Sequence, residues 1–249
     1  MKAEEHIYPY TLSDFSNHNA IVLAPHPDDE SIGCGGSIVK HTRAGSRVRV
    51  IFLTKGGRGD FEGRFGEDYL NIRLDCARKA LGILGVKEYE FWEYKDRELV
   101  SAEKEIAGKL FQVVKDFSPS IIYAPSPFEI HPDHRAAFSF AWNLIRNMPL
   151  HLLLYETLVP LFPDTLVNIT DEWQYKKRAV ESYWTELYYN NYSGKVEGLN
   201  RYRTATLSKE VLYAEAFLSA DAGVLSKDTL QSKLLHSAIS FHSFDALQH

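Results

Sequence analysis

Residues 20–30 read AIVLAPHPDDE and contain the pattern that decides the fold. The first five residues form a short, continuous apolar run, which is typical of a strand buried on both faces of a sheet. A histidine, two aspartates and a glutamate follow, and each of them can bind a metal ion or transfer a proton. In open α/β sheets, ligands bind at the carboxyl ends of the strands. The stretch therefore indicates a buried strand with a polar site at its end.

Strand-like and helix-like segments alternate through the rest of the chain. Further strands are predicted at residues 47–54, 88–92, 119–124, 151–155 and 166–170. Helices are predicted at residues 35–44, 69–84, 101–117, 132–147, 172–187 and 209–218, and loops at residues 55–66 and 190–203. Strands that alternate with helices of this length imply a parallel sheet with right-handed crossovers. We predict an α/β fold, Rossmann-like and doubly wound, with a mostly parallel sheet and helices on both faces.

The composition excludes several classes of protein. Of the 249 residues, 45% are hydrophobic and 24% are charged, as in an ordinary globular protein and unlike a disordered or collagen-like chain. The 28 Lys and Arg against 33 Asp and Glu give a net charge of −5, whereas sequence-independent nucleic-acid binding needs a basic face. No segment approaches the roughly 18 apolar residues that span a bilayer. We expect no nucleic-acid partner and no membrane span.

The sequence also predicts a location and a domain organisation. Cys34 and Cys76 form no C-x-x-C pattern, and the first residues lack the apolar core of a signal peptide. These features predict a cytoplasmic protein with reduced thiols. Because no repeat or linker divides the chain, residues 1–249 are expected to form one domain, with an N-terminal extension at 1–19 and a C-terminal elaboration of strands and helices at 166–249.

A second polar cluster, His-Pro-Asp-His at residues 131–134, follows the fourth predicted strand. Pro132 suits the first position of a helix. His131 and His134 are then three residues apart and face the same space. Taken alone, this cluster could be a pair of exposed histidines at a helix start, and residues 26–30 could be a solvated turn.

The two clusters become informative together. In the strand order 3-2-1-4-5 of a doubly wound sheet, the first and fourth strands are neighbours, so the loops after them open into one crevice. The side chains expected to converge there are His26, Asp28, Asp29, His131 and His134. Two imidazoles and a carboxylate with one open position form a usual catalytic zinc set.

The expected chemistry is hydrolysis of an amide or an ester. Adjacent residues of an extended loop point in opposite directions, so one of Asp28 and Asp29 is expected to bind the metal while the other acts as a general base. A zinc ion lowers the pKa of bound water to about 7, which makes hydroxide available at neutral pH. A further histidine, held protonated beside the metal, could stabilise an oxyanion or protonate a leaving amine.

The motifs at residues 26–30 and 131–134 resemble those of the LmbE/PIG-L family of zinc-dependent N-deacetylases. Weaker supporting segments are Arg73, Leu84–Val86 and Tyr213–Phe217. The resemblance covers the chain from about residue 20 to residue 217. It implies metal-dependent removal of an N-acetyl group, through a metal-bound hydroxide, from a small N-acetylglucosamine-type glycoconjugate, which would be the partner of this protein.

The resemblance also assigns roles to individual residues. It implies that His26, Asp29 and His134 bind the metal, which would be Zn²⁺, Fe²⁺ or another divalent ion. It implies that Asp28 is the general base and that His131 stabilises the tetrahedral intermediate. These implied roles resolve which aspartate binds the metal.

The substrate is less well defined by the sequence. The chain has Cys76 where the family often has a glutamate, and YWTE at residues 183–186 where the family has a histidine followed by Ser-Gln. Arg58 or Lys55, in the glycine-rich loop, could reach over the crevice, or the loop could be mobile and solvated. Arg58 and Arg73 are predicted to contact the substrate. The differences from the family at residues 76 and 183–186 leave open which sugar is the substrate.

Several alternatives stay open. The aromatic segment at residues 183–192 could stack on sugar rings or pack on the core. A carbohydrate- or metal-binding protein without turnover and an amidase for a longer acyl group are the other functions considered, and a homo-oligomer is compatible with the sequence. An NAD site is not predicted, because Ile38 stands where the third glycine would be. The histidines without metal-ligand spacing are His151, His236, His242 and His249.

Overall fold

The computed structural model describes residues 8–220 and contains a seven-stranded sheet with the order β3-β2-β1-β4-β5-β7-β6. The strands are β1 (Ala20–Ala24), β2 (Val48–Thr54), β3 (Glu88–Tyr94), β4 (Ile121–Pro125), β5 (His151–Tyr155), β6 (Thr165–Asn168) and β7 (Ala214–Ala220). Strands β1 to β5 run parallel in the predicted order, whereas β7 lies antiparallel to both β5 and β6. The prediction of a mostly parallel, doubly wound sheet is confirmed.

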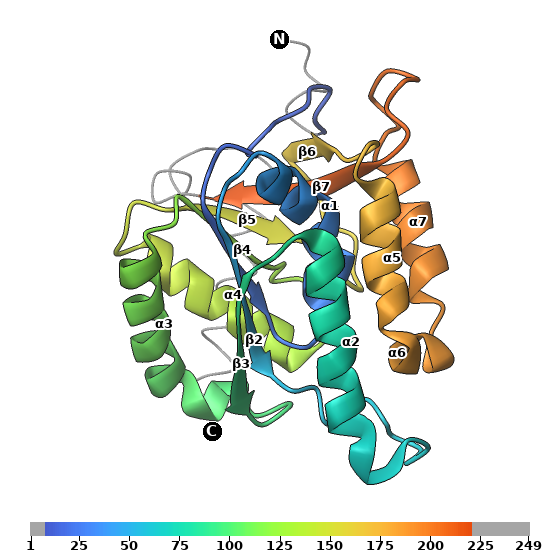
Figure 1. Cartoon of the computed structure of the whole chain (residues 1–249). Helices are drawn as coiled ribbons and strands as arrows, with labels where there is room; N and C mark the ends of the chain where they lie inside the picture. The colour runs from blue at the N-terminus through green and yellow to red at the C-terminus, as the bar shows by residue number, and fades with distance from the viewer. Residues whose placement is uncertain (1–7, 221–249) are drawn as a thin grey trace.

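Helices cover both faces of this sheet (Figure 1). They are α1 (Asp29–Arg43), α2 (Tyr69–Leu84), α3 (Glu103–Phe117), α4 (Pro132–Ile145), α5 (Trp173–Ser182), α6 (Trp184–Tyr189) and α7 (Tyr192–Tyr202), with 3-10 turns at Gly66–Asp68 and Leu99–Ala102. Val22 of β1 belongs to the core beneath α1, α2 and α5, whereas Ile21 and Leu23 belong to the core beneath α3 and α4. Full burial of one such side chain stabilises the fold by about 1.5–3 kcal/mol. None of the helices within residues 8–220 combines the length and the apolar character needed to cross a membrane.

The first helix begins earlier than predicted. It starts at Asp29 and not at residue 35, and Asp29 and Glu30 lie in its first turn, where the helix dipole stabilises carboxylates. A glycine within this first part of the helix allows close packing, because a Cβ on Gly33 would lie 2.1 Å from Cδ2 of Tyr155 in β5. A candidate metal ligand, Asp29, is therefore held on a helix rather than on a loop.

The prediction of a loop at residues 190–203 is wrong, because this segment contains α7. The side chain of Asn191 caps the helix by accepting a hydrogen bond from the backbone N–H of Gly194. The helix predicted at residues 172–187 is interrupted at Tyr183, where α5 ends and α6 follows. The polar composition of α7 is typical of a loop, but the cap and packing stabilise a helix there.

The helix predicted at residues 209–218 is also wrong, because residues 214–220 form β7. Pairing with β5 and β6 outweighs the helix propensity of this alanine-containing segment. Glu215 is buried within it, and its carboxylate accepts hydrogen bonds from the backbone N–H of Ser37 at 2.8 Å and from Nζ of Lys176 at 2.7 Å. These bonds tie the added strand to α1 and α5.

Candidate active site

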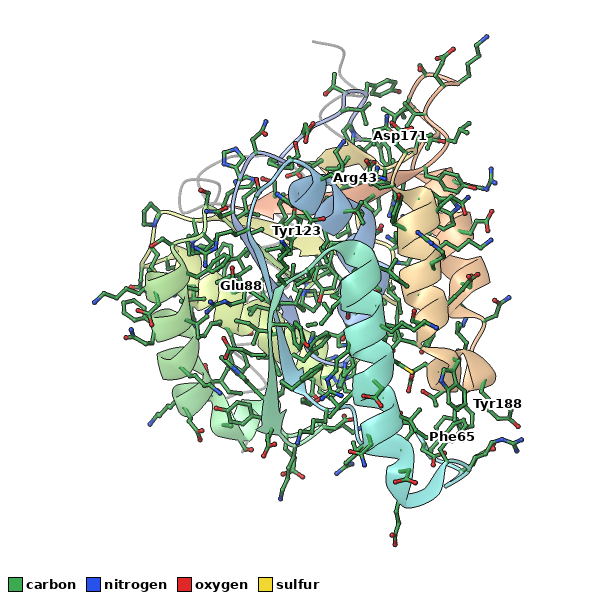
Figure 2. All side chains as sticks on the ribbon, in the orientation of Figure 1. Arg43, Phe65, Glu88, Tyr123, Asp171 and Tyr188 are labelled. Carbon is green, nitrogen blue, oxygen red and sulfur yellow. The ribbon has the colours of Figure 1, made fainter. Side chains whose placement is uncertain are left out.

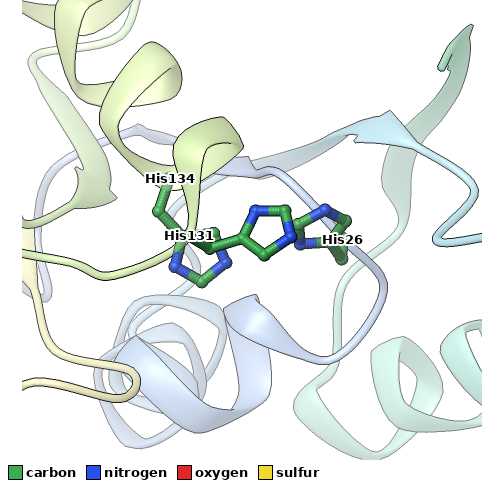
Figure 3. A group of neighbouring side chains, drawn as sticks. All are labelled: His26, His131 and His134. Carbon is green, nitrogen blue, oxygen red and sulfur yellow. The ribbon is translucent and has the colours of Figure 1, made fainter. Parts of the chain in front are cut away.

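The order of the sheet brings the two histidine motifs together, because β1 and β4 are neighbours. His26 lies in the turn after β1, whereas His131 and His134 lie at the start of α4 (Figure 3). One ring nitrogen of each histidine lies within 4.8 Å of the others. The structure thus places the three imidazoles at one point on the carboxyl edge of the sheet.

Asp29 lies between two of these histidines. Its Oδ2 is 3.3 Å from Nδ1 of His26 and 3.3 Å from Nε2 of His134, and all three side chains are buried. Ligands that bind a tetrahedral metal ion at about 2.0–2.2 Å lie about 3.3–3.6 Å from one another. The donor types and their spacing therefore fit a divalent ion held by these three residues.

His26 and His134 each have one ring nitrogen that faces Asp29, and the other ring nitrogen of each has a partner of its own. Nε2 of His26 lies 3.2 Å from Oδ2 of Asp133, and Nδ1 of His134 lies 3.0 Å from the hydroxyl of Thr157. Metal-binding histidines almost always donate their second N–H to such a group, which fixes the orientation of the ring. Burial opposes protonation of His134, but the neighbouring Asp29 raises its pKa to about 9. The site therefore stabilises positive charge.

Asp28 lies beside this cluster but has a different partner. Its φ of 135° is a backbone conformation that residues other than glycine rarely adopt, and such strain is often found at functional sites. Oδ2 of Asp28 lies 3.3 Å from Nη2 of Arg73. Burial raises the pKa of Asp28 well above its ordinary range. The two aspartates are separated as predicted, although by a strained turn before α1 and not by an extended loop.

Arg73, predicted as a substrate contact, is fully engaged by the protein. Its five N–H groups donate hydrogen bonds to the carbonyls of Pro27 (two bonds) and Gly56, the hydroxyl of Tyr69 and the carboxylate of Asp28. A guanidinium has five such groups in total. Arg73 therefore positions Asp28 while it also lines the pocket, and its contact with substrate stays a prediction.

His131 is held as a neutral ring. Its Nδ1 accepts a hydrogen bond from the backbone N–H of Asp133 at 3.2 Å, so the ring proton is on Nε2. Nε2 lies 3.8 Å from Oδ1 of Asp96. Burial, together with the neighbouring His26 and His134, lowers the pKa of His131 to about 4. The structure does not support the expected protonated histidine and favours a neutral hydrogen-bond donor.

These groups line one pocket of about 200 Å³. The predicted site residues in its wall are His26, Asp28, Asp29, Arg58, Arg73, His131 and His134. Further wall residues include Phe61, Asp96, Arg97, Glu186, Tyr189 and Tyr192. The pocket places a candidate metal site, a buried carboxylate and a neutral imidazole around one polar space, which is an arrangement suited to hydrolysis.

Comparison with known proteins identifies the family of the chain. Residues 21–145 match the family described as GlcNAc-PI de-N-acetylase, PIG-L. The chain belongs to the PIG-L family. A diacetylchitobiose deacetylase from Thermococcus kodakarensis is 32% identical to it over 185 residues, which cover 66% of this chain and 68% of the relative.

Two further proteins are similar to this PIG-L chain. A probable N-acetyl-alpha-D-glucosaminyl L-malate deacetylase 2 from Bacillus anthracis is 31% identical over 143 residues, which cover 54% of this chain and 62% of the relative. The structure of N,N'-diacetylchitobiose deacetylase from Pyrococcus horikoshii matches with a TM-score of 0.75 and 24% identity, over 88% of this chain and 90% of that one. The structural match confirms the fold that the family resemblance implies.

In this PIG-L chain, the glycine-rich loop after β2 passes directly over Arg73. Gly56 has a φ of 67°, and a Cβ there would lie 2.6 Å from Cζ of Arg73, so only glycine fits. Arg58 in the same loop lines the pocket. Lys55 instead forms an ion pair with Glu93 at 2.5 Å. Of the two cations considered for this loop, the structure places Arg58 at the site.

An aromatic wall of the pocket comes from two segments. The rings of Phe61 and Tyr189 have centroids 4.3 Å apart, and both residues line the pocket. Phe65 and Tyr188 lie together close by (Figure 2), with ring centroids 6.0 Å apart. Tyr183 is buried in the core. The tyrosine-rich segment therefore packs on the core at its start and forms part of the pocket wall at its end, and stacking on a sugar ring stays a prediction.

Three carboxylates near the histidine cluster were not predicted as site residues, and one of them, Asp96, lines the pocket. Asp96 follows β3, and Glu129 lies between β4 and α4, where it accepts hydrogen bonds from the backbone N–H groups of Thr157 and Leu158. Asp133 is part of the second motif but was given no role. All three carboxylates follow strands at the carboxyl edge of the sheet, so the rule that located the histidines could have located them too.

The histidines without metal-ligand spacing are not part of the described pocket. Nε2 of His151 lies 3.1 Å from the hydroxyl of Ser219, and these two residues belong to the paired strands β5 and β7. His236, His242 and His249 lie outside the described residues. Cys76 is buried, as expected of an ordinary thiol on the inner face of a helix.

Proposed function

We propose that this protein is a metal-dependent amide hydrolase that removes the N-acetyl group from a small N-acetylglucosamine-type conjugate. The observation that carries the proposal is the division between Asp29, which lies 3.3 Å from both His26 and His134, and Asp28, which lies in the same pocket with Arg73 as its partner. A protein that only binds a metal or a sugar has no need of the second carboxylate. Membership of the PIG-L family and the named activities of its relatives support this proposal.

The proposed cofactor is a divalent ion, Zn²⁺ in the first instance and Fe²⁺ as the alternative. His26, Asp29 and His134 would hold it, since two imidazoles and one carboxylate are a usual catalytic zinc set. The ion would supply Lewis acidity to the amide carbonyl.

The protein groups account for the proton transfers. Hydrolysis adds water across the C–N bond, so that the acyl carbon gains a hydroxyl group and leaves as acetate, while the nitrogen gains a proton and leaves as an amine. Asp28 would take the proton from the attacking water, and its raised pKa makes it a stronger base than an exposed aspartate. The same carboxyl group can return the proton to the leaving nitrogen. The Nε2–H of His131 would donate a hydrogen bond to the oxyanion.

The pocket wall supports a sugar as the substrate. Phe61 and Tyr189 offer aromatic faces, and Arg58, Asp96 and Arg97 offer polar groups for hydroxyls. A relative acts on diacetylchitobiose according to its name, and we propose a substrate of the same kind for this chain. We place the reaction in the cytoplasm, which the two free, buried cysteines support.

The test is a screen for acetate release. Purified protein is stripped with a chelator, reloaded with Zn²⁺ or Fe²⁺, and incubated with N-acetylglucosamine, N,N'-diacetylchitobiose and N-acetylglucosaminyl malate. We expect acetate and the matching free amine, lost on chelation and restored by one of the metals. Metal-replete protein that binds these sugars and releases no acetate would instead be a binding protein.

A further inference from the structure

Glu129 carries a buried charge that no lysine or arginine balances. It lies between β4 and α4, and both Glu129 and the nearby His134 are buried. Within residues 8–220, its carboxylate forms an ion pair with His134 and with no lysine or arginine. An isolated carboxylate is costly to bury unless other groups compensate its charge. The groups that compensate Glu129 therefore indicate what its charge acts on.

Three successive backbone N–H groups compensate part of this charge. Oε1 of Glu129 accepts a hydrogen bond from the N–H of Thr157 at 2.8 Å and from that of Leu158 at 3.2 Å. The N–H of Val159 donates to the same oxygen at 3.3 Å. Thr157 and Leu158 line the active-site pocket. Glu129 therefore fixes the position of this part of the pocket wall.

The rest of the compensation comes from His134, which lies in the first turn of α4 (Figure 3). Oε2 of Glu129 lies 3.6 Å from Nδ1 of His134, and the hydroxyl of Thr157 lies 3.0 Å from the same nitrogen. The other nitrogen of the ring, Nε2, faces Asp29. An imidazole that binds a metal ion through Nε2 carries its proton on Nδ1. This N–H then faces both the hydroxyl of Thr157 and the carboxylate of Glu129.

We propose that Glu129 is a positioning residue of the metal site, which strengthens the binding of a divalent ion through His134 and Thr157. The inference rests on the proposed function, in which His134 is a metal ligand. The carboxylate makes the imidazole a better ligand, because it stabilises positive charge on the ring. It also holds the hydroxyl of Thr157 in place by accepting the backbone N–H of the same residue. Partners of this kind typically change metal affinity by about 10- to 100-fold.

The variant Glu129→Gln separates the charge of this residue from its position. The amide oxygen of glutamine can still accept the backbone N–H groups of residues 157–159, whereas the negative charge is lost. The Kd of the full-length protein for Zn²⁺ is measured by competition with a chromogenic chelator, so the test does not depend on turnover. We expect Glu129→Gln to raise this Kd by about 10- to 100-fold. Thr157→Val removes the hydroxyl, keeps the backbone N–H and is expected to raise the Kd within the same range.

Glu156→Gln is the matched control for the loss of a buried carboxylate. Glu156 precedes Thr157 in the chain and is also buried, but its charge is balanced by an ion pair with Arg203. We expect Glu156→Gln to keep the Zn²⁺ Kd of the natural protein. The visible absorption of bound Co²⁺ depends on its ligands, so its band maxima are expected to shift in Glu129→Gln and to stay unchanged in Glu156→Gln. A purely structural role of Glu129 would not move these bands.

Two outcomes would overturn the proposal. One is a Glu129→Gln protein, shown to be folded by circular dichroism, with the Zn²⁺ Kd and the Co²⁺ spectrum of the natural protein. The other is an unchanged Zn²⁺ Kd in Thr157→Val, which decides the question even where Glu129→Gln does not fold. Either result beside acetate release by the natural protein would leave the proposed function standing. Zinc binding that weakens in both variants, in a protein that releases no acetate, would support the inference and contradict the proposed function.

Discussion

The guanidinium of Arg73 lies 3.3 Å from the carboxylate of Asp28, and each of its five N–H groups donates a hydrogen bond to the protein. Nη1 of Arg73 is also 3.1 Å from Oε1 of Glu186. Both side chains of the Arg73–Asp28 pair are buried. The arginine thus fixes the position of the carboxylate that we propose as the general base, and it links that carboxylate to the glycine-rich loop through Gly56.

Replacement of Arg73 by lysine tests this positioning role. A lysine keeps the charge but cannot supply five donors in a planar fork. We expect Arg73→Lys to lower kcat by about 10- to 100-fold with the metal content unchanged, because a misplaced base costs rate and not metal binding. Arg78→Lys, on the exposed face of the same helix, is the control. An Arg73→Lys enzyme with the kcat of the natural protein would show that Asp28 does not need this partner.

Replacement of His131 by alanine tests the proposed oxyanion contact. We expect His131→Ala to lower kcat by about 10²- to 10³-fold, the usual effect of losing one such donor. The metal content is expected to stay at that of the natural protein, whereas His134→Ala is expected to lose the ion. Loss of metal in His131→Ala would instead place this histidine among the ligands.

The aromatic wall predicts an effect on substrate affinity. Phe61 is 70% exposed and pairs with Tyr189 at the pocket, so its ring is available to a sugar. We expect Phe61→Ala to raise KM by up to about tenfold with little change in kcat, since an aromatic contact contributes about 0.5–1.5 kcal/mol. Phe162 is 57% exposed and does not line the pocket, which makes Phe162→Ala a matched control. An equal KM for both variants would remove Phe61 from the substrate site.

Stability should depend on pH through His41, which lies away from the active site. Its Nε2 lies 2.9 Å from the hydroxyl of Tyr123, and burial lowers its pKa to about 4. The unfolded chain binds a proton near pH 6.5, so the free energy of unfolding falls as the pH drops from 6.5 to 4, by about 3 kcal/mol in total. In urea unfolding experiments between pH 6.5 and pH 4, the free energy of unfolding of His41→Gln is expected to fall by about 3 kcal/mol less than that of the natural protein. His18→Gln, at an exposed histidine, is expected to show the same fall as the natural protein.

The sequence predicts the centre of this protein better than its periphery. Residues 20–30 locate β1 and the polar groups at its end, and parallel pairing with β4 brings His131 and His134 to the same place. This works because a buried parallel strand has an unmistakable apolar run and because strand order determines which ends meet. The convergence of the two motifs therefore follows from the sequence alone.

The rest depends on tertiary contacts that local patterns do not reveal. β7 has the composition of a helix, and only its pairing with β5 and β6 makes it a strand. Arg73 was singled out by the sequence, but its sequence neighbours give no sign that Pro27, Gly56 and Tyr69 accept its hydrogen bonds. Phe61 and Tyr189 are brought together from separate segments that no sequence pattern connects.

In the proposed site, Asp29 binds the metal and Asp28 takes the proton from water. This division of roles is tested most directly by measuring the metal content and the acetate release of Asp28→Asn and Asp29→Asn side by side. We expect Asp28→Asn to keep about one ion per chain and to lose at least about 10²-fold in kcat, and we expect Asp29→Asn to lose the ion itself. An Asp28→Asn protein without metal, beside an Asp29→Asn protein that retains it, would show that the two roles are the other way round.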